Sequence, residues 1–428
     1  MRCDEWQAYP LSAVTKLVID YRGKTPKKLG GDWCESGYPA LSAKNIKTGT
    51  LVQEESIRFV DESLYKRWMK DEIERGDILI TSEAPFGQVY HWDSDEKIVL
   101  SQRLFGIRLT EEVHPRFGYY YMTTDQFQSE LANRATGTTV TGLRQPELLK
   151  CLIRYPSLPE QRAIAATLSC LDDKIELNNR MNKNLEEMAQ ALFKSWFVDF
   201  DPVKAKMEGR EPAGMDAETA ALFPEEFEDS ELGPIPKGWR VSLLEDLIEL
   251  FDSKRVPLSS RQRTSMAKIY PYYGAASLMD YVDDYIFDGT YVLLGEDGTV
   301  VDDKGFPVLQ YVWGKFWVNN HAHVLQGRAG FNVDSLYMLL RHTHVAPIIT
   351  GAVQAKISQA RLKSIKTNIS SPGLLKVYNG LVAGLFAKKR EVLDENTRLT
   401  VLRDTLLPKL MSGEIRVPEA EGILEEVL

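Results

Sequence analysis

Residues 159–200 read PEQRAIAATLSCLDDKIELNNRMNKNLEEMAQALFKSWFVDF, and their pattern determines the architecture of the chain. It contains no Gly or Pro after Pro159, and apolar residues recur along it in alternating steps of three and four. This heptad pattern predicts one long helix with an apolar stripe on one side. About 40 residues at about 1.5 Å each give a rod of roughly 60 Å. A single helix cannot bury such a stripe, so a partner is required.

The partner lies further along the same chain. A shift of 214 residues places Thr136–Gly137 on Thr350–Gly351 and carries the first helix onto a second one without a gap. The predicted seam consists of Leu168, Leu171, Ile175, Asn182, Leu185 and Leu192 in the first helix and of Val382, Leu385, Asn396, Leu399 and Leu406 in the second. Asn182 falls on Asn396. A polar seam residue costs stability but fixes register, and we expect this role for the pair.

Each predicted helix follows a segment with short β-like runs. The runs are Tyr38–Leu41, Asp77–Thr81, Gly87–His91 and Ser101–Leu109 in the first segment and Tyr270–Ala276, Tyr291–Leu294 and Phe316–Leu325 in the second. The helical parts align without gaps, whereas the β-rich parts differ in length and sequence. The sequence therefore predicts an α+β fold with two modules in tandem, each followed by a long helix.

The predicted domain boundaries follow from these patterns and from two acidic segments. They are a first module (1–156), a first helix (157–200), an acidic Pro/Gly linker (201–236), a second module (237–370), a second helix (371–412) and an acidic tail (413–428). The net charge is −9, but residues 201–232 and 411–428 together account for −11, which leaves +2 for the rest. A weakly positive body is compatible with DNA binding, although partner subunits would have to add phosphate contacts.

Cysteine usage and hydropathy indicate where the protein works. The four cysteines, at positions 3, 34, 151 and 170, show no paired spacing, and the chain starts without a secretory leader. This favours free thiols in a reducing cytoplasm. No apolar run approaches the roughly 18 residues that a membrane span needs, so we expect no membrane association.

The sequence offers little that points to catalysis. It has no GxxxxGK[ST] phosphate loop and no Asn-Pro-Pro-Tyr or Asp-Pro-Pro-Tyr tetrapeptide of an amino-methyltransferase. The pairs His321-x-His323 and His342-x-His344 could place two imidazoles on one strand face, but polar strand faces explain them better than a metal site. Ser82–Glu83 and Glu296–Asp297 follow strands at turns, and a turn role is favoured over acid/base chemistry. We expect no catalytic site, no metal and no cofactor on this chain.

Several phrases in a fixed order resemble the specificity subunit of type I restriction-modification enzymes. They are Leu158–Gln161 (LPEQ), Phe193–Phe197 (FKSWF), GDILIT followed by Ala84–Gly87 (APFG), Gly295–Gly298 (GEDG), Asn319–His323 (NNHAH) and the loop Thr136–Thr139 (TGTT). The resemblance covers nearly the whole chain. One departure is the second helix start, which reads Ser371-Pro372-Gly373-Leu374-Leu375 in place of Leu-Pro-x-x-Glu-Gln.

The resemblance implies a non-catalytic subunit that reads DNA. Each module would read one half of a split sequence in double-stranded DNA, and the two helices would pair as an antiparallel coiled coil that sets the distance between the halves. The partners would be two methyltransferase subunits, which bind S-adenosylmethionine, and endonuclease/translocase subunits. Two alternatives stay open at this point, namely a coiled-coil adaptor without DNA readout and an enzyme with an unrecognised active site.

Base readout needs polar side chains on loops that reach the major groove. The candidates in the first module are Lys44, Asn45, Thr138, Thr139 and Arg144, and those in the second are Tyr272, Tyr273, Asn320, His321, Lys356 and Gln359. A solvated or structural role is the alternative for each of them. The loop Thr136–Thr139 is the best single candidate, because its Gly lets the backbone approach a phosphate closely.

Overall fold

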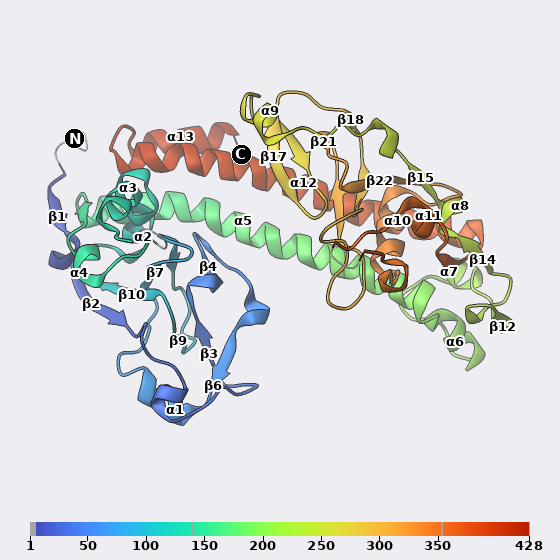
Figure 1. Cartoon of the computed structure of the whole chain (residues 1–428), viewed down its shortest axis with the longest axis horizontal. Helices are drawn as coiled ribbons and strands as arrows, with labels where there is room; N and C mark the ends of the chain where they lie inside the picture. The colour runs from blue at the N-terminus through green and yellow to red at the C-terminus, as the bar shows by residue number, and fades with distance from the viewer. Residues whose placement is uncertain (1–5, 138–140, 352–353, 428) are drawn as a thin grey trace. The chain divides into compact units, whose positions relative to one another are not determined.

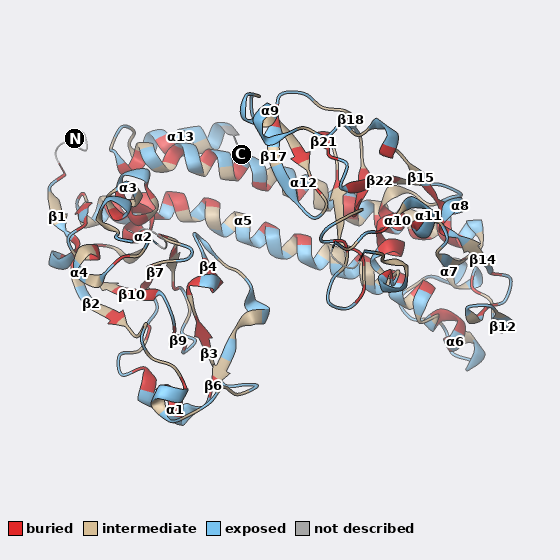
Figure 2. Cartoon of the chain, viewed as in Figure 1, coloured by how far each residue is buried: buried red, intermediate tan, exposed pale blue. Residues whose placement is uncertain are grey.

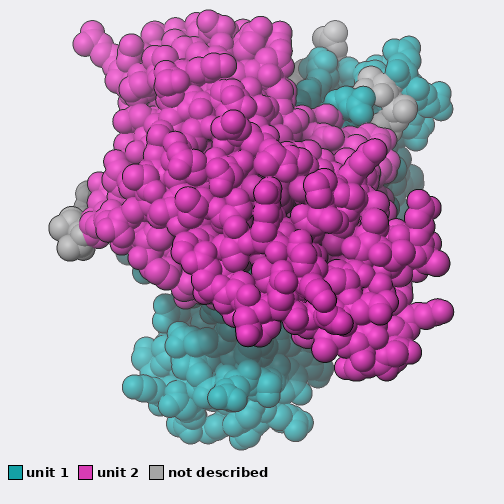
Figure 3. All heavy atoms as spheres, turned by 90° about the vertical axis from the view of Figure 1, so that its right-hand side faces the viewer, with its two compact units in different colours: residues 1–177, 395–428 teal, residues 178–394 magenta. Residues whose placement is uncertain are grey.

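The structure, a computed structural model, describes residues 6–137, 141–351 and 354–427. The chain forms two compact units, unit 1 with residues 1–177 and 395–428 and unit 2 with residues 178–394 (Figure 3). Each unit contains a β-rich module together with one half of each of two long helices, α5 (Leu158–Phe193) and α12 (Pro372–Met411) (Figure 1). The predicted fold class, two α+β modules that alternate with two long helices, is confirmed.

The module of unit 1 is built on two small sheets, with strand orders β2-β10-β7-β8 and β6-β3-β9. The strands are β2 (Thr15–Asp20), β3 (Tyr38–Leu41), β6 (Arg58–Val60), β7 (Ile78–Thr81), β8 (Val89–His91), β9 (Val99–Leu100) and β10 (Leu104–Leu109), with a small hairpin of β4 (Ile46–Lys47) and β5 (Thr50–Leu51). The helices are α1 (Glu62–Trp68), α2 (Pro115–Thr123), α3 (Asp125–Arg134) and α4 (Gln145–Leu148). β1 (Ala8–Pro10) pairs with β11 (Leu152–Arg154), the strand that leads into α5.

The module of unit 2 repeats this plan, with strand orders β15-β22-β19-β20 and β17-β16-β21-β18. The strands are β15 (Ile248–Leu250), β16 (Tyr270–Tyr273), β17 (Leu278–Val282), β18 (Phe287–Asp288), β19 (Tyr291–Gly295), β20 (Leu309–Val312), β21 (Lys315–Val318) and β22 (Ala322–Gly327). The helices are α8 (Leu244–Leu247), α9 (Ser260–Thr264), α10 (Val333–Arg341) and α11 (Gln359–Lys363). β14 (Arg240–Leu243) pairs with β23 (Lys366–Ile369), the strand that precedes α12.

One strand boundary differs from the prediction and matters for the site. The run Phe316–Leu325 is two strands, β21 and β22, separated by a turn at Asn319–His321. The turn forms because the Asn319 side-chain Oδ1 accepts a hydrogen bond of 2.8 Å from the His321 N–H, which closes an Asx turn. The run Ser101–Leu109 of unit 1 begins with the same interruption, since β9 ends at Leu100 and β10 starts at Leu104.

Within each unit the two long helices run antiparallel. In unit 1, Arg403 on α12 pairs with Asp172 at 2.8 Å, and Lys174 pairs with Glu395 at 3.3 Å, so positions that rise along α5 fall along α12. In unit 2, Glu186 pairs with Lys389, and Phe193 further along α5 contacts Tyr378 earlier in α12, so the helices are antiparallel there too. Buried and exposed residues alternate along both helices, as the heptad pattern predicts (Figure 2).

The seam residues divide between two hydrophobic cores. In unit 1, Leu168, Leu171, Leu399 and Leu406 are at most 1% exposed and share one cluster, with Ile175 packed against it. In unit 2, Val382 is fully buried, and Leu185, Leu192 and Leu385 are half-buried. Asn182 and Asn396 are 7% and 8% exposed. Asn396 donates to the Ile175 carbonyl at 3.5 Å, whereas neither amide atom of Asn182 has a hydrogen-bond partner among the described residues.

The two acidic segments, treated above as lying outside the ordered body, are packed parts of the units. Residues 201–236 form α6 (Asp201–Met207), α7 (Ala217–Ala221) and a hairpin of β12 (Phe227–Ser230) and β13 (Gly233–Pro236). The tail forms α13 (Val417–Val427). A few apolar residues anchor these mostly exposed segments: Phe223 and Ile235 join the core of unit 2, and Ala420 joins that of unit 1. No helix of the described residues is long and apolar enough to cross a membrane.

Candidate nucleic-acid interface

Four turns of unit 1 are tied together by backbone hydrogen bonds. We call residues 42–45, 82–84, 101–103, 136–137 and 141–142 turn cluster 1. The bonds run from the N–H of Ser101 to the Leu41 carbonyl (2.8 Å), from Ala43 to Gln102 (3.1 Å), from Ser82 to Arg103 (2.8 Å) and from Leu143 to Ser82 (3.0 Å). Thr136 and Gly142 exchange two bonds of 2.9 Å, which close the base of the fourth loop. The backbone under these turns is therefore fixed.

Unit 2 repeats the arrangement with a different sequence. Turn cluster 2 consists of residues 274–279, 296–298, 319–321, 350–351 and 354–356. The bonds run from the N–H of Asn319 to the Tyr273 carbonyl (3.1 Å), from Glu296 to His321 (2.8 Å) and from Ile357 to Glu296 (2.8 Å). Thr350 and Lys356 exchange two bonds of 2.9 and 2.8 Å, as Thr136 and Gly142 do. Each module thus presents loops on the same hydrogen-bonded frame.

The side chains at the centre of the two clusters correspond in position but not in identity. Gln102 and Arg103 are exposed in cluster 1, and Asn320 and His321 occupy the equivalent places in cluster 2. Arg103 Nε lies 3.2 Å from a carboxylate oxygen of Glu83, and His321 Nδ1 lies 2.5 Å from Asp297. Each cluster therefore presents an amide beside a nitrogen-rich side chain that a carboxylate orients. Such groups can form hydrogen bonds with base edges.

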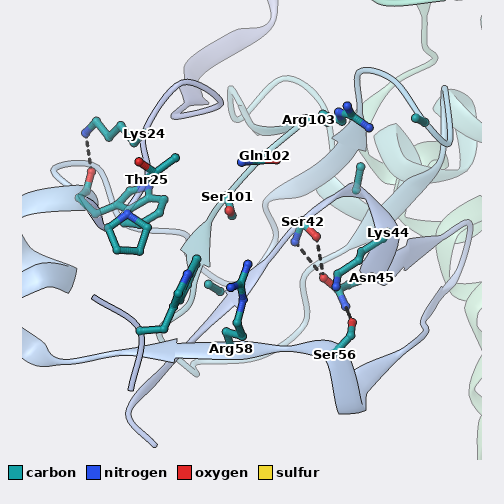
Figure 4. Close-up of a pocket in the computed structure, with 16 residues that line it drawn as sticks. Lys24, Thr25, Ser42, Lys44, Asn45, Ser56, Arg58, Ser101, Gln102 and Arg103 are labelled. Carbon is teal, nitrogen blue, oxygen red and sulfur yellow. Dashed lines mark hydrogen bonds between the residues drawn. The ribbon is translucent and has the colours of Figure 1, made fainter. Parts of the chain in front are cut away.

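A cationic pocket of about 270 Å³ adjoins turn cluster 1 (Figure 4). Its charged lining residues are Lys24, Lys44, Arg58 and Arg103, and its lining includes no carboxylate. The Arg58 guanidinium lies 4.2 Å from the centre of the Trp33 ring, which keeps it extended along the wall. A concave site with four cations and no acid suits a phosphate or another anionic group.

A buried ionic network holds turn cluster 2 to the sheet of unit 2. His323 is fully buried, and its Nδ1 and Nε2 lie 2.6 Å from Asp252 and 2.8 Å from the Ile357 carbonyl. Arg255 pairs with Glu296 at 2.8 Å. Burial opposes ionisation of Asp252, but its bonds to His323 and to the Val324 N–H outweigh burial and lower its pKa. Asp252, Glu296 and His323 bring three possible metal-ligand atoms within 4.8 Å, and each is already engaged in this network.

The carboxylates considered for acid/base chemistry lie in these same turns. Glu83 pairs with Arg103, Glu296 with Arg255 and Lys356, and Asp297 with His321. Each therefore orients a neighbouring side chain of its turn cluster, as a turn role predicts.

The predicted DNA-contacting residues fall into four groups. The exposed ones, in or next to the turn clusters, are Lys44, Arg144, Asn320, His321, Lys356 and Gln359. Tyr273 is half-buried, with its ring edge-on to Phe316. Thr138 and Thr139 lie outside the described residues.

Asn45 and Tyr272 do not fit the predicted role, because each is only 1% exposed. The Asn45 amide is used within its own loop, where Oδ1 accepts from the Ser42 N–H at 3.1 Å and Nδ2 donates to the Gln53 carbonyl at 3.2 Å. The Tyr272 hydroxyl accepts from the Leu258 N–H at 3.0 Å. Both side chains stabilise loops from inside the module, and neither is accessible to a ligand.

Sequence analysis missed Gln102, Arg103 and the cations Lys24 and Arg58. The signal for the first two was present, because IVLSQRLFGIRL and FWVNNHAHVL align in the internal repeat and place Gln102–Arg103 on Asn320–His321. Lys24 and Arg58 lie outside the segments of the two modules that were aligned by sequence, so the repeat did not reveal them.

The chain has two α+β modules, each joined to paired long helices. Each module presents polar loops on the same set of backbone hydrogen bonds. This arrangement is typical of a recognition protein with two reading surfaces. The family profile described as type I restriction modification DNA specificity domain matches residues 3–187 and 236–374. The chain belongs to this family of type I restriction-modification specificity subunits, whose function is DNA target recognition.

Curated relatives match over most of their length. The chain is 26% identical to the MjaIX specificity subunit of Methanocaldococcus jannaschii over 419 residues, which covers 93% of this chain and 91% of the relative. It is also 26% identical to the HindI specificity subunit of Haemophilus influenzae, covering 81% and 88%. The crystal structure of an S subunit from M. genitalium has the same fold, with a TM-score of 0.53, 17% identity and coverage of 95% and 96%.

Proposed function

We propose that this chain reads the two halves of a split double-stranded DNA target, one half with turn cluster 1 and the other with turn cluster 2. The observation that carries the proposal is the repeated hydrogen-bonded frame under two different sets of exposed side chains. A shared frame docks the modules on DNA in the same way, while Gln102–Arg103 and Asn320–His321 select different bases. The chain supplies specificity and leaves the chemistry to other subunits.

Those partners are two methyltransferase subunits, which bind S-adenosylmethionine, and endonuclease/translocase subunits. The support for them is family membership together with the small net charge, +2, of the chain outside its two acidic segments. A chain with this charge needs cations from partner subunits to hold DNA firmly. Two copies of the methyltransferase match the two-fold repeat of the chain, one for each module and adjoining half of the helix pair. Assembly on host DNA places the protein in the cytoplasm.

Sequencing of methylated bases tests this function directly. DNA is taken from a host that expresses the chain with its methyltransferase partner, and from the same host without the chain. Chain-dependent methylation at a motif of two short halves separated by a fixed number of unspecified bases is expected. If a stable complex forms but no chain-dependent motif appears, the adaptor function replaces the proposal. Methylation or cleavage by the isolated chain would instead identify an unrecognised active site.

The paired helices set the spacing between the half-sites, and Asn182 and Asn396 fix their register. Replacing both residues by Leu is expected to raise the free energy of unfolding by about 1–3 kcal/mol, because the buried Asn182 amide has no partner among the described residues. The same variant should methylate motifs with more than one spacer length. Denaturant unfolding and methylation sequencing measure the two effects. Higher stability with one unchanged spacer would exclude the register role.

Gly351 in turn cluster 2 is expected to be essential for reading the second half-site. Its φ is +91°, and an added Cβ would lie 2.0 Å from the Gln354 carbonyl oxygen. Gly351→Ala should displace the 350–356 loop, at a cost of about 1–2 kcal/mol and hence about tenfold in DNA affinity. Methylation sequencing should show relaxed bases in the second half-site and an unchanged first half-site.

Gly384→Ala is the matched control, because a Cβ at this position of α12 meets nothing within 4 Å. Alanine favours a helix over glycine, so this variant should keep both half-sites and full stability. Equal loss of affinity in the two variants would show that the 350–356 loop has no special role.

A further inference from the structure

The exposed turn at residues 101–103 contains an arginine in a backbone conformation that favours glycine. Arg103 has φ = +65°, in the left-handed region. A side chain in this region is strained, and such strain persists where a particular side chain is needed. The position therefore keeps an arginine where the fold alone would be better served by glycine.

The Arg103 backbone is fixed while its donors are free to meet a ligand. Its carbonyl accepts the 2.8 Å bond from Ser82, and the carbonyl of Gln102 accepts the 3.1 Å bond from Ala43. Glu83 engages Nε, and the two terminal nitrogens make no hydrogen bond with any residue that the structure describes. The side chain is 48% exposed. A rigid base with an oriented, half-exposed guanidinium is prepared for a ligand at low entropic cost.

The residues around Arg103 suit two kinds of DNA contact, one to a phosphate group and one to a base. Lys44 and Arg58 line the cationic pocket with Arg103 (Figure 4), and these cations suit a phosphate group of DNA. Lys24 also lines the pocket, and its Nζ donates to the Trp68 carbonyl at 2.6 Å. Arg103 lines the same pocket, but it lies on the exposed turn just before the buried strand β10. Beside it, the Gln102 amide is exposed and makes no hydrogen bond with the described residues. An arginine fork next to a free amide matches the major-groove edges of purines.

We propose that Arg103 is the residue of the first module that specifies a guanine, through paired hydrogen bonds to O6 and N7 of that base. The inference rests on the proposed function and assigns one base class to one residue. Glu83 acts as a positioning residue that orients the guanidinium. In the second module His321, held by Asp297, occupies the equivalent position, so that module reads a different base or base step.

The test uses the full chain in complex with its methyltransferase and duplexes that contain the methylated motif. Each guanine of the first half-site is replaced in turn by 7-deazaguanine, which lacks the N7 acceptor. The wild-type complex is expected to lose about 5- to 150-fold in affinity at one guanine, the range for a paired arginine–guanine contact. Arg103→Gly should bind the normal and modified duplexes equally and should accept any base at that position of the motif.

Two further variants separate base reading from structure and from charge. Arg103→Gly should unfold at the same temperature as the wild type or a higher one, because glycine relieves the backbone strain. Gln53→Gly relieves the same kind of strain at φ = +52° outside the pocket lining, and should read both half-sites normally. Arg103→Lys keeps the charge but not the planar fork, and should weaken the guanine preference.

The outcomes are distinct. The inference would be overturned if Arg103→Gly kept its sensitivity to 7-deazaguanine. It would also be overturned if Arg103→Gly lost DNA affinity equally for every base of the motif while Arg103→Lys stayed fully active, because Arg103 would then be a phosphate contact. A first half-site without guanine would overturn it too. If the wild-type chain directs no split motif at all, the proposed function fails, and the inference falls with it.

Discussion

Asp252→Ala is expected to lower the free energy of unfolding of unit 2 by about 3–5 kcal/mol, the cost of removing one partner from a buried ionic network. The Asp252 carboxylate accepts bonds from His323, Gln359 and the Val324 N–H, and its side chain is 5% exposed. Without it, Glu296 is the one carboxylate left beside the buried His323 and the neighbouring Arg255 among the described residues. Hydrogen exchange should show lost protection in β15, β22 and α11, and reading of the second half-site should fail.

The matched control is Asp283→Ala, which removes an exposed carboxylate from the same unit and should change stability by no more than about 0.5 kcal/mol. Acidification offers a second check. Because the folded-state pKa of Asp252 is lowered, its contribution is complete above about pH 4, the pKa of an unfolded aspartate, and is lost as the pH falls through the folded value. Equal destabilisation by the two variants would show that the network contributes nothing specific.

Tyr378→Ala is expected to destabilise the helix pairing in unit 2 by about 3–5 kcal/mol, as for other large aromatic side chains removed from a core. Tyr378 on α12 is fully buried, and its ring centre lies 5.8, 6.0 and 4.9 Å from those of Phe193, Trp196 and Phe197 at the end of α5. Hydrogen exchange along both helices measures the effect. Tyr378→Phe keeps the ring and loses only a 3.5 Å contact to the Ala189 carbonyl, so its cost should stay near 1 kcal/mol. Similar costs for both variants would contradict packing as the cause.

The sequence predicted the long helices well, because periodicity reports directly on a buried stripe. The expected helices at 157–200 and 371–412 correspond to α5 and α12, and the runs Tyr38–Leu41 and Tyr291–Leu294 lie in strands. The main difference is at the end of the first helix, where Lys194–Val198 form a π-helical turn that buries Trp196 and Phe197. Composition misled the reading of residues 201–236, because a few buried apolar side chains outweigh many exposed acids.

The candidate site was harder to predict than the fold. In the sequence, a polar loop residue that faces solvent, such as Asn320, cannot be told from a buried one that stabilises its loop, such as Asn45. Only the tertiary hydrogen bonds distinguish the two. The pocket beside turn cluster 1 likewise depends on Lys24, Arg58 and Arg103, which are far apart in sequence and are brought together by the sheets.

The division of the chain into units has a consequence for its synthesis. Unit 2 is one continuous stretch, residues 178–394, whereas unit 1 needs residues 395–428 to complete the core around Leu168 and Leu171. On the ribosome, the second module can close its core first, and the first module keeps an uncovered apolar stripe until residues 395–428 emerge. An incomplete product of translation would keep that stripe exposed, and is therefore a natural substrate for chaperones and proteases.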